Sequence, residues 1–299
     1  MKTLREALAD ADARQAAIGH FNISEFGALK GIMDGARELS AAHGGDKLPI
    51  LIGVSEGERE FLGVKEAAAM VRAMRDMFDY PVYINADHTH SIDKVREVAE
   101  AGFDEIIFDA SKLPFEENLA QTKEAVALAR SINPAIVIEG EIGYIGSSSE
   151  IVSERPQESM KYSTPDEAAR FVRETGVDVL APAVGNMHGL LKSMVTGEDH
   201  KKLDIALIGE IRKAIGDAGC RFMTLHGGSG TADEDFVAAA KNGMTIIHVS
   251  SELRLAWRQG MERSLKDQPD EIAPYKLLGP SVEHIKNIVS GRLRLFNGI

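Results

Sequence analysis

Apolar residues give way to ionisable ones within a single stretch, Tyr80-Pro81-Val82-Tyr83-Ile84-Asn85-Ala86-Asp87-His88-Thr89-His90. Its first half has the β-branched and aromatic residues of a buried strand, and its second half holds a carboxylate and two imidazoles. A strand that ends in polar side chains is typical of a barrel with its site on the rim. A lone Asp-His pair is more often a hydrogen-bonded turn than a metal site, so the other strand ends decide the interpretation.

Seven other apolar runs have the same character, and amphipathic helical stretches separate them. This alternation predicts a parallel sheet, and eight strands close a (β/α)8 TIM barrel, the fold class that we expect. The predicted strands are 16–21, 48–54, 80–87, 105–109, 135–142, 177–184, 221–226 and 245–250. We expect residues 1–299 to form one α/β domain, with residues 270–299 as a C-terminal helical extension.

Composition excludes several functional classes. The net charge of -12 argues against a nucleic-acid or anionic-membrane partner. The sequence has no run of about twenty apolar residues, so it predicts no membrane span. The single cysteine, Cys220, excludes an intramolecular disulfide and is interpreted as a buried structural thiol. The N-terminus lacks the apolar core of a signal peptide, and together these features predict a cytoplasmic location.

Histidines and carboxylates gather at the predicted strand ends. In a parallel barrel all strand C-termini share one face, so His88, His188 and His226 should meet there. Each histidine alone would more often be structural, but three imidazoles with an open fourth position suit a catalytic Zn²⁺ or a similar divalent ion. The neighbouring carboxylates could orient the imidazoles, act as acid or base, or add a ligand; they are Asp87, Asp109, Glu139 and Glu141. A fourth histidine, His248, lies near the end of the eighth predicted strand, on the same rim.

The loops that follow the later strands add a second signal. A glycine-rich turn, 226–231, precedes a predicted helix N-terminus, and Ser250 and Ser251 open the next helix. Loops seven and eight are where barrels usually hold phosphate. The polar segment 143–163 could fold over such a pocket, whereas segment 190–202 is interpreted as a solvent loop. A metal beside a phosphate pocket suits aldol cleavage, in which the ion stabilises an enediolate.

These motifs together resemble the metal-dependent class II ketose-bisphosphate aldolases, which include fructose- and tagatose-bisphosphate aldolases. The resemblance runs over nearly the whole chain, and the order of its motifs on successive strands makes it specific. The motifs are Gly19-His20-Phe21-Asn22-Ile23, Asn85-Ala86-Asp87-His88, Ile107-Phe108-Asp109-Ala110-Ser111 with 113–118, Ile138-Glu139-Gly140-Glu141-Ile142-Gly143, Gly185-Asn186-Met187-His188-Gly189, Leu225-His226-Gly227-Gly228-Ser229-Gly230 and Ser251-Glu252-Leu253-Arg254.

The resemblance implies a role for each matching position. His88, His188 and His226 would bind the metal, usually Zn²⁺ or else an ion such as Co²⁺, with Glu141 as an alternative or outer ligand. Asp87 would be the proton shuttle. Substrate and phosphate contacts would come from Asn22, Ser55, Gly189, Gly227, Ser229, Ser250 and Ser251. Family members often hold a monovalent cation, Na⁺ or K⁺, in this phosphate cradle, and they imply a homodimer or homotetramer. Ser55 is equally well explained as a helix cap.

Two departures from the family pattern bear on the substrate. His248 stands where the family usually has a substrate-contacting asparagine, so we place it with the substrate-binding residues. The loop after the fifth strand reads Gly146-Ser147-Ser148-Ser149-Glu150 instead of Gly-Gly-x-Glu-Asp, which leaves Glu150 as the candidate acid-base residue. Lys112 and Arg254 are available for a second phosphate.

The leading hypothesis is an aldolase that reversibly cleaves a phosphorylated ketose, such as fructose 1,6-bisphosphate, into dihydroxyacetone phosphate and an aldehyde. The same chemistry on a sulfonated or non-phosphorylated acceptor is the first alternative. A barrel metallohydrolase would use His88-Thr89-His90 as a His-x-His pair, but that group carries the pair on its first strand. A Schiff-base aldolase would need a lysine at the end of strand six, and a non-catalytic sugar-phosphate binder would not need Asp87.

Overall fold

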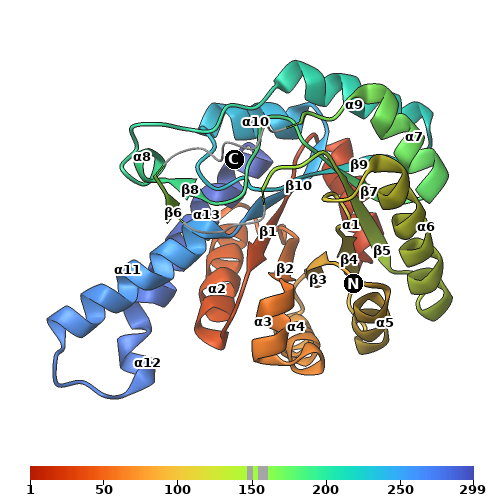
Figure 1. Cartoon of the computed structure of the whole chain (residues 1–299). Helices are drawn as coiled ribbons and strands as arrows, with labels where there is room; N and C mark the ends of the chain where they lie inside the picture. Colours follow the sequence, from red (N-terminus) through yellow and green to blue (C-terminus); the bar gives the residue numbers. More distant parts are fainter. Residues whose placement is uncertain (147–150, 154–160) are drawn as a thin grey trace.

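The computed structural model describes residues 1–146, 151–153 and 161–299 (Figure 1). Eight parallel strands close into a barrel in the order β1-β10-β9-β7-β5-β4-β3-β2, which confirms the predicted TIM barrel. The barrel strands are β1 Ile18–Asn22, β2 Ile50–Val54, β3 Val82–Thr89, β4 Glu105–Phe108, β5 Val137–Ile142, β7 Val179–Pro182, β9 Phe222–Leu225 and β10 Met244–Val249. Outside the barrel, β6 (Ile151–Val152) pairs in parallel with β8 (Leu190–Leu191). That residues 1–299 form one domain stays a prediction.

Helices follow the strands and surround the barrel (Figure 1). They are α2 Phe26–Ala42, α3 Glu56–Leu62, α4 Val64–Phe78, α5 Ile92–Ala101, α6 Phe115–Ile132, α7 Pro165–Thr175, α8 Lys192–Val195, α9 Ile205–Asp217, α10 Asp233–Lys241 and α11 Ser251–Asp267. Helices α5 and α7 are capped by Ser91 and Thr164, whose side chains accept from backbone N–H groups. Within the described part of the chain, no helix combines the length and apolar character needed to cross a membrane.

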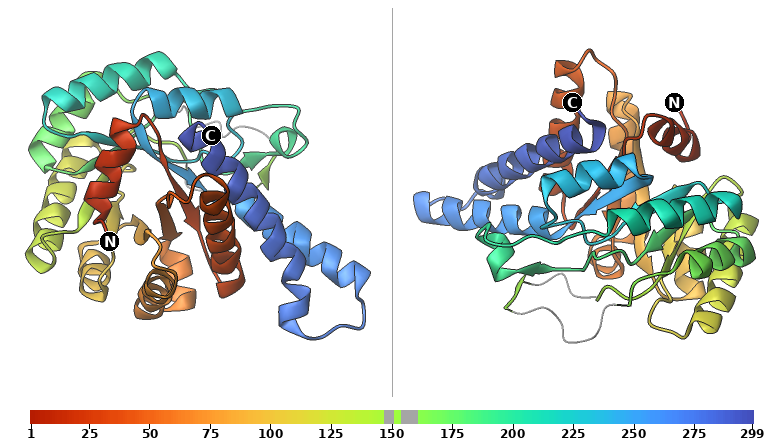
Figure 2. Two further views of the ribbon diagram at one scale, coloured as in Figure 1. Left: turned by 180° about the vertical axis from the view of Figure 1, so that it is seen from behind. Right: turned by 90° about the horizontal axis from the view of Figure 1, so that it is seen from above.

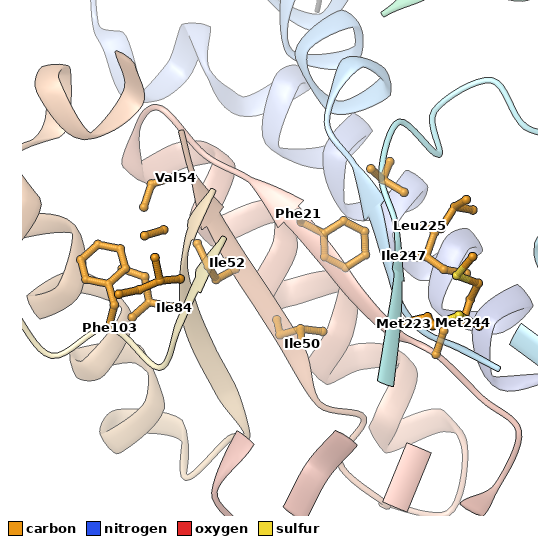
Figure 3. Packing of buried hydrophobic residues seen from close by; sticks show 14 of the residues in the cluster. Phe21, Ile50, Ile52, Val54, Ile84, Phe103, Met223, Leu225, Met244 and Ile247 are labelled. Atoms are coloured by element: carbon orange, nitrogen blue, oxygen red, sulfur yellow. The ribbon is translucent and has the colours of Figure 1, made fainter. Parts of the chain in front are cut away.

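Strand residues alternate between the two sides of the barrel wall. Outward residues, such as Ile52 and Ile84, belong to the main core with buried helix residues such as Leu29 and Val71, and Figure 3 shows part of this packing. Inward residues are apolar at the strand starts and become polar toward the strand ends. The inward series run Ile18-His20-Asn22 on β1, Tyr83-Asn85-Asp87 on β3 and Val137-Glu139-Glu141 on β5. The polar side chains of the barrel interior therefore gather at one mouth, where the strands end.

The opposite mouth is closed by helix α1 (Leu4–Ala13), which the sequence analysis did not predict. Leu4 and Leu8 are buried against the apolar strand starts, including Leu51 and Tyr83. Ion pairs fix the helix at both ends: Arg5 contacts Asp178 at 2.8 Å, and Arg212 contacts Asp12 at 2.7 Å. Because α1 fills the N-terminal mouth, only the C-terminal mouth is left for a substrate.

The predicted C-terminal helical extension consists of α12 (Pro274–Leu277) and α13 (Gly279–Asn297). Figure 2 shows α13 running back along α2 from the end of a helical arm that α11 and α12 form. The contact with α2 is close, since a Cβ atom at Gly31 would lie 2.7 Å from the Val282 carbonyl oxygen. Leu293 and Phe296 are buried in the main core. Helix α13 is therefore packed into the layer of helices around the barrel.

Candidate active site

The third strand carries an irregularity at its polar end. Between Ala86 and Thr89 its pairing with β4 shifts register, so β3 has one extra residue there, as in a β-bulge. His88 has φ 44°, in the left-handed region that a non-glycine residue rarely adopts. The bulge turns Asp87 and His88 toward the same mouth, and such strain commonly marks a functional position.

The buried side chain of Arg59, in α3, holds this turned backbone. Its guanidinium donates to the Asp87 carbonyl oxygen at 3.1 Å and the Thr89 hydroxyl at 3.2 Å, and also to the Val54 carbonyl. Burial lowers the pKa of Arg59, while the nearby Asp87 opposes that change. Sequence reasoning missed Arg59, because nothing in an Arg-Glu-rich helix start distinguishes a buried arginine from an exposed one.

The structure brings His88, His188 and His226 together at the mouth. The ring centroids of His88 lie 5.0 Å from His188 and 4.9 Å from His226, and the last two lie 6.0 Å apart. One nitrogen from each ring lies within 4.8 Å of the other two, a spacing compatible with a shared ion. His90 stays out of this cluster: its ring is close to half exposed, and Nδ1 lies 2.9 Å from the Asp109 carbonyl oxygen.

Carboxylates fix the orientation of two of these rings. Asp109 Oδ2 lies 2.9 Å from His88 Nδ1, and Glu139 Oε1 lies 2.5 Å from His226 Nε2. The remaining nitrogens, His88 Nε2 and His226 Nδ1, therefore face each other at 3.3 Å. A carboxylate on the far nitrogen selects the tautomer and makes the near nitrogen a better ligand. The structure thus presents oriented ligand atoms, which sequence spacing alone could not establish.

Glu141 completes this cluster with a buried oxygen. Its Oε2 lies 3.7 Å from the Nδ1 atoms of both His88 and His226 and has no hydrogen-bond partner among the described residues. Burial, reinforced by the charge of Asp109, raises the pKa of Glu141 to about 7. A buried carboxylate oxygen without a partner is costly unless something binds it. The three imidazoles therefore fit a divalent metal ion, and the Glu141 oxygen lies next to two of their rings.

Asp87 lies beside the histidine cluster, with Oδ1 3.7 Å from His88 Nε2, and lines the same cavity as His88 and His188. Its Oδ2 accepts a hydrogen bond from Asn22 at 2.7 Å, whereas Oδ1 makes no hydrogen bond within the described residues. Burial disfavours the carboxylate, but His88, His20 and His226 outweigh it and lower the pKa of Asp87. The side chain is therefore an ionised carboxylate with one oxygen that makes no hydrogen bond within the described residues.

Asn22 links Asp87 to a second polar network. The same amide donates to Glu58 Oε2 at 3.0 Å, and Arg254 donates to Glu58 Oε1 at 2.6 Å. Ser55 is the N-cap of α3, and its backbone N–H donates to Glu58 at 2.8 Å. Ser55 also lines the cavity, so a capping role and a substrate contact are compatible.

His248, the departure from the family pattern, lies inside the site. It occupies the position on β10 that pairs directly with His20 on β1, and the two rings stack with centroids 3.5 Å apart. His248 also stacks on His226 at 4.3 Å. Burial, with the neighbouring histidines, keeps the pKa of His248 well below its usual value, so the ring is neutral. Its Nε2 has no partner in the described structure, and the residue lines the cavity.

One cavity of about 280 Å³ is lined by all eight of the predicted substrate and phosphate residues. Its lining includes Asn22, Ser55, Asp87, His88, His188, Gly189, Gly227, Ser229, His248, Ser250 and Ser251. The Ser250 hydroxyl is buried without a partner among described residues, at the start of helix α11, where an anion would be favoured. Lys112 and Arg254 line the same cavity. Glu150 lies outside the described residues.

Comparison with known proteins gives the same class of enzyme. The family model for "Fructose-bisphosphate aldolase class-II" matches residues 2–299. The chain is 33% identical over 297 residues to the "Probable fructose-bisphosphate aldolase" of Bacillus subtilis (strain 168), covering 98% of this chain and 96% of that protein. The fructose-bisphosphate aldolase of Geobacillus stearothermophilus matches equally, with 33% identity and the same coverage.

A solved structure agrees with this assignment. The crystal structure of the YdjI aldolase from Escherichia coli K12 superposes with a TM-score of 0.78 at 27% identity, covering 98% of this chain and 96% of that chain. The fold and the histidine-carboxylate mouth define an aldehyde lyase of the metal-dependent kind. The chain belongs to the class II fructose-bisphosphate aldolase family.

Proposed function

We propose that this aldolase reversibly cleaves a phosphorylated ketose, such as fructose 1,6-bisphosphate or a related ketose phosphate, into dihydroxyacetone phosphate and an aldehyde. The observation that carries the proposal is Asp87 Oδ1, a buried carboxylate oxygen that makes no hydrogen bond within the described residues, beside the three-histidine cluster. A base in this position can take the proton of the hydroxyl that becomes the aldehyde. The hydrogen bond from Asn22 holds the carboxylate in place for that transfer.

The proposed metal ligands are His88, His188 and His226, with Glu141 as an alternative or outer ligand. Zn²⁺ is the ion that we expect, with Co²⁺ as a substitute. A divalent ion bound there would act as a Lewis acid toward the substrate carbonyl. Asp109 and Glu139 orient two of the ligand rings through their far nitrogens.

The residues of the proposed phosphate cradle line the same cavity. Gly189, Gly227 and Ser229 come from the loops after β7 and β9, and Ser250 and Ser251 begin α11. Backbone N–H groups at a helix start and serine hydroxyls are suitable donors to a phosphate. Ser55 stays a predicted contact at the dihydroxyacetone phosphate end, and Glu150 stays the predicted acid-base residue of the loop after β5.

The second candidate is the same aldol reaction with a different aldehyde, which would bind in the part of the cavity beside His248. His248 supports it, since this neutral imidazole replaces the usual asparagine and presents an unpartnered Nε2 in the described site. An imidazole is wider than a carboxamide, and it forms a hydrogen bond with a substrate hydroxyl in a different geometry. An aldehyde that carries a sulfonate or no charged group is therefore the alternative acceptor. Lys112 and Arg254 are the available cations for an anionic one.

The test is a metal-reconstituted cleavage screen over phosphorylated ketoses, coupled to detection of dihydroxyacetone phosphate. We expect turnover with Zn²⁺ or Co²⁺ and its loss on chelation, and full activity in excess chelator would disprove the metal role. The variant Asp87→Asn should keep the bound metal and lose turnover by about 100-fold or more. Asp93→Asn, an exposed carboxylate on α5, is the matched control.

Variants of the ligands separate metal binding from the rest of the reaction. His88→Ala should lower metal content and turnover together, and unchanged metal content would refute its assignment. Tight binding of a ketose phosphate without turnover would instead favour a non-catalytic binder. A homodimer or homotetramer and a cytoplasmic location stay predictions; light scattering and cell fractionation would test them.

A further inference from the structure

A buried lysine lies beside the phosphate cradle. Lys201 is 1% exposed, although the sequence analysis interpreted segment 190–202 as a solvent loop. That interpretation is wrong at both ends of the segment, since Leu190 and Leu191 are also buried. The Lys201 backbone N–H donates to the Gly230 carbonyl at 2.8 Å and forms a parallel bridge with Thr231. The lysine is therefore anchored to the glycine-rich loop after β9.

The Lys201 ammonium group donates to three backbone carbonyl oxygens. It lies 2.6 Å from Met187 O, 2.8 Å from Gly189 O and 2.9 Å from Gly227 O. Three carbonyl dipoles that converge on one point form a site of negative potential, and such a site stabilises a small monovalent cation. The three donors of an ammonium group match the three oxygens.

The three carbonyls belong to the loops that carry the proposed chemistry. Met187 and Gly189 flank His188, and Gly227 follows His226. The Lys201 side chain therefore joins the loop after β7 to the loop after β9 and fixes the spacing of two ligand histidines. It also lines the cavity together with Gly189 and Gly227. Its positive charge thus lies next to the place proposed for the substrate phosphate. The low effective dielectric constant of a buried site strengthens the attraction between the ammonium and the phosphate.

We infer that Lys201 is the internal cation of the phosphate cradle and takes the place of an exchangeable Na⁺ or K⁺. The monovalent cation expected from the sequence is then replaced by a covalently attached ammonium group. This inference rests on the proposed function for the identity of the anion as a sugar phosphate. Phosphate binding, and the effect of Na⁺ or K⁺ on it, can be measured without turnover, so the inference can be tested separately from the proposed reaction.

The test measures binding of inorganic phosphate by calorimetry, in a buffer whose only added monovalent cation is tetramethylammonium. The wild-type protein should bind phosphate with an affinity that added K⁺ or Na⁺ leaves unchanged. Lys201→Met should weaken binding by about tenfold or more, as for the loss of a buried charged partner. Added NH₄⁺ or K⁺ should restore part of the lost affinity, because the three carbonyls are then open to a small cation.

Lys202→Met is the matched control, because Lys202 is the exposed neighbour of Lys201. It should bind phosphate like the wild type at every salt composition. A wild-type affinity that rises with K⁺ would overturn the inference, as would a folded Lys201→Met variant with unchanged phosphate affinity. If Lys201→Met does not fold, the cation titration of the wild type still decides. Failure of the aldolase assay with intact, cation-independent phosphate binding would reject the proposed reaction and leave Lys201 in its role.

Discussion

His20 and His248 occupy directly paired positions on neighbouring parallel strands, and their imidazoles stack with planes 3° apart. Both rings are buried, and burial lowers the pKa of each, so the pair stacks without charge repulsion. His20 lies deeper than the cavity lining, whereas His248 lines the cavity. The pair therefore fixes the plane of the His248 ring at the wall of the cavity.

Replacement of His248 by asparagine, the usual family residue, should change substrate preference. We expect the kcat/KM for the native ketose phosphate to fall by about tenfold or more, since a paired polar group is lost. Metal content and phosphate affinity should stay as in the wild type. His20→Ala should cause a smaller loss in the same direction through the orientation of His248. His43→Asn, on an exposed loop, is the control, and equal effects on all ketose phosphates would contradict a selective role.

Gly53 leaves the space that the His20 ring occupies. A Cβ atom there would lie 2.0 Å from His20 Cε1 and 2.4 Å from Nε2. Gly53→Ala should therefore displace the ring and destabilise the fold by about 1–3 kcal/mol, measured by urea unfolding. The double variant Gly53→Ala with His20→Ala should recover much of that loss, because the smaller side chain removes the clash. Additive losses would show that the strain arises elsewhere.

The barrel fold and the histidine cluster could both be predicted from the sequence, for one physical reason. Parallel strands end on one face, so His88, His188 and His226 had to converge once the strands were placed. Their orientation depends on carboxylates such as Glu139, whose partner is fixed only by the closed barrel. His20 lies in a quoted motif, yet its stacking partner is 228 positions away (248 − 20) and becomes visible only through the strand register.

The burial of two cationic side chains and the presence of helix α1 could not be predicted from the sequence. Lys201 and Arg59 are surrounded by polar residues in sequence, and polarity predicts exposure for both. Each is buried because backbone carbonyls converge on it, and such convergence is a property of loops and bulges in three dimensions. The helix α1 was missed for another reason: its apolar face serves the barrel mouth, outside the repeating strand-helix pattern.

Cys220 should be chemically inert in the native protein. Burial raises the pKa of its thiol to about 11, and Sγ lies 3.2 Å from the Asp178 carbonyl oxygen. A raised pKa means that the folded state favours the neutral thiol. Its contribution to stability is therefore complete below the unfolded pKa of about 8.5 and is lost as the pH rises through about 11.

The measurement is alkylation by iodoacetamide at pH 9, followed by mass spectrometry. Native Cys220 should react far more slowly than the same residue in urea, and the stability of Cys220→Ala should fall less than that of the wild type between pH 9 and 11. Equal alkylation rates for native and unfolded protein would contradict the buried-thiol assignment.

Glu139 and Glu105 are two buried carboxylates of the barrel interior, and they should differ sharply in their effect on metal binding. Glu139 Oε1 contacts His226 Nε2 at 2.5 Å, so Glu139→Gln should lower Zn²⁺ affinity by about 10–100-fold, measured by competition with a chelating dye. Glu105 instead accepts from Asn85 at 2.7 Å, and burial beside Glu139 holds its pKa well above the usual value. Burial therefore favours its neutral form, and Glu105→Gln replaces that form by a neutral group of the same shape. Equal losses of Zn²⁺ affinity in the two variants would mean that general disturbance of the barrel interior, and not the contact with His226, controls the metal site.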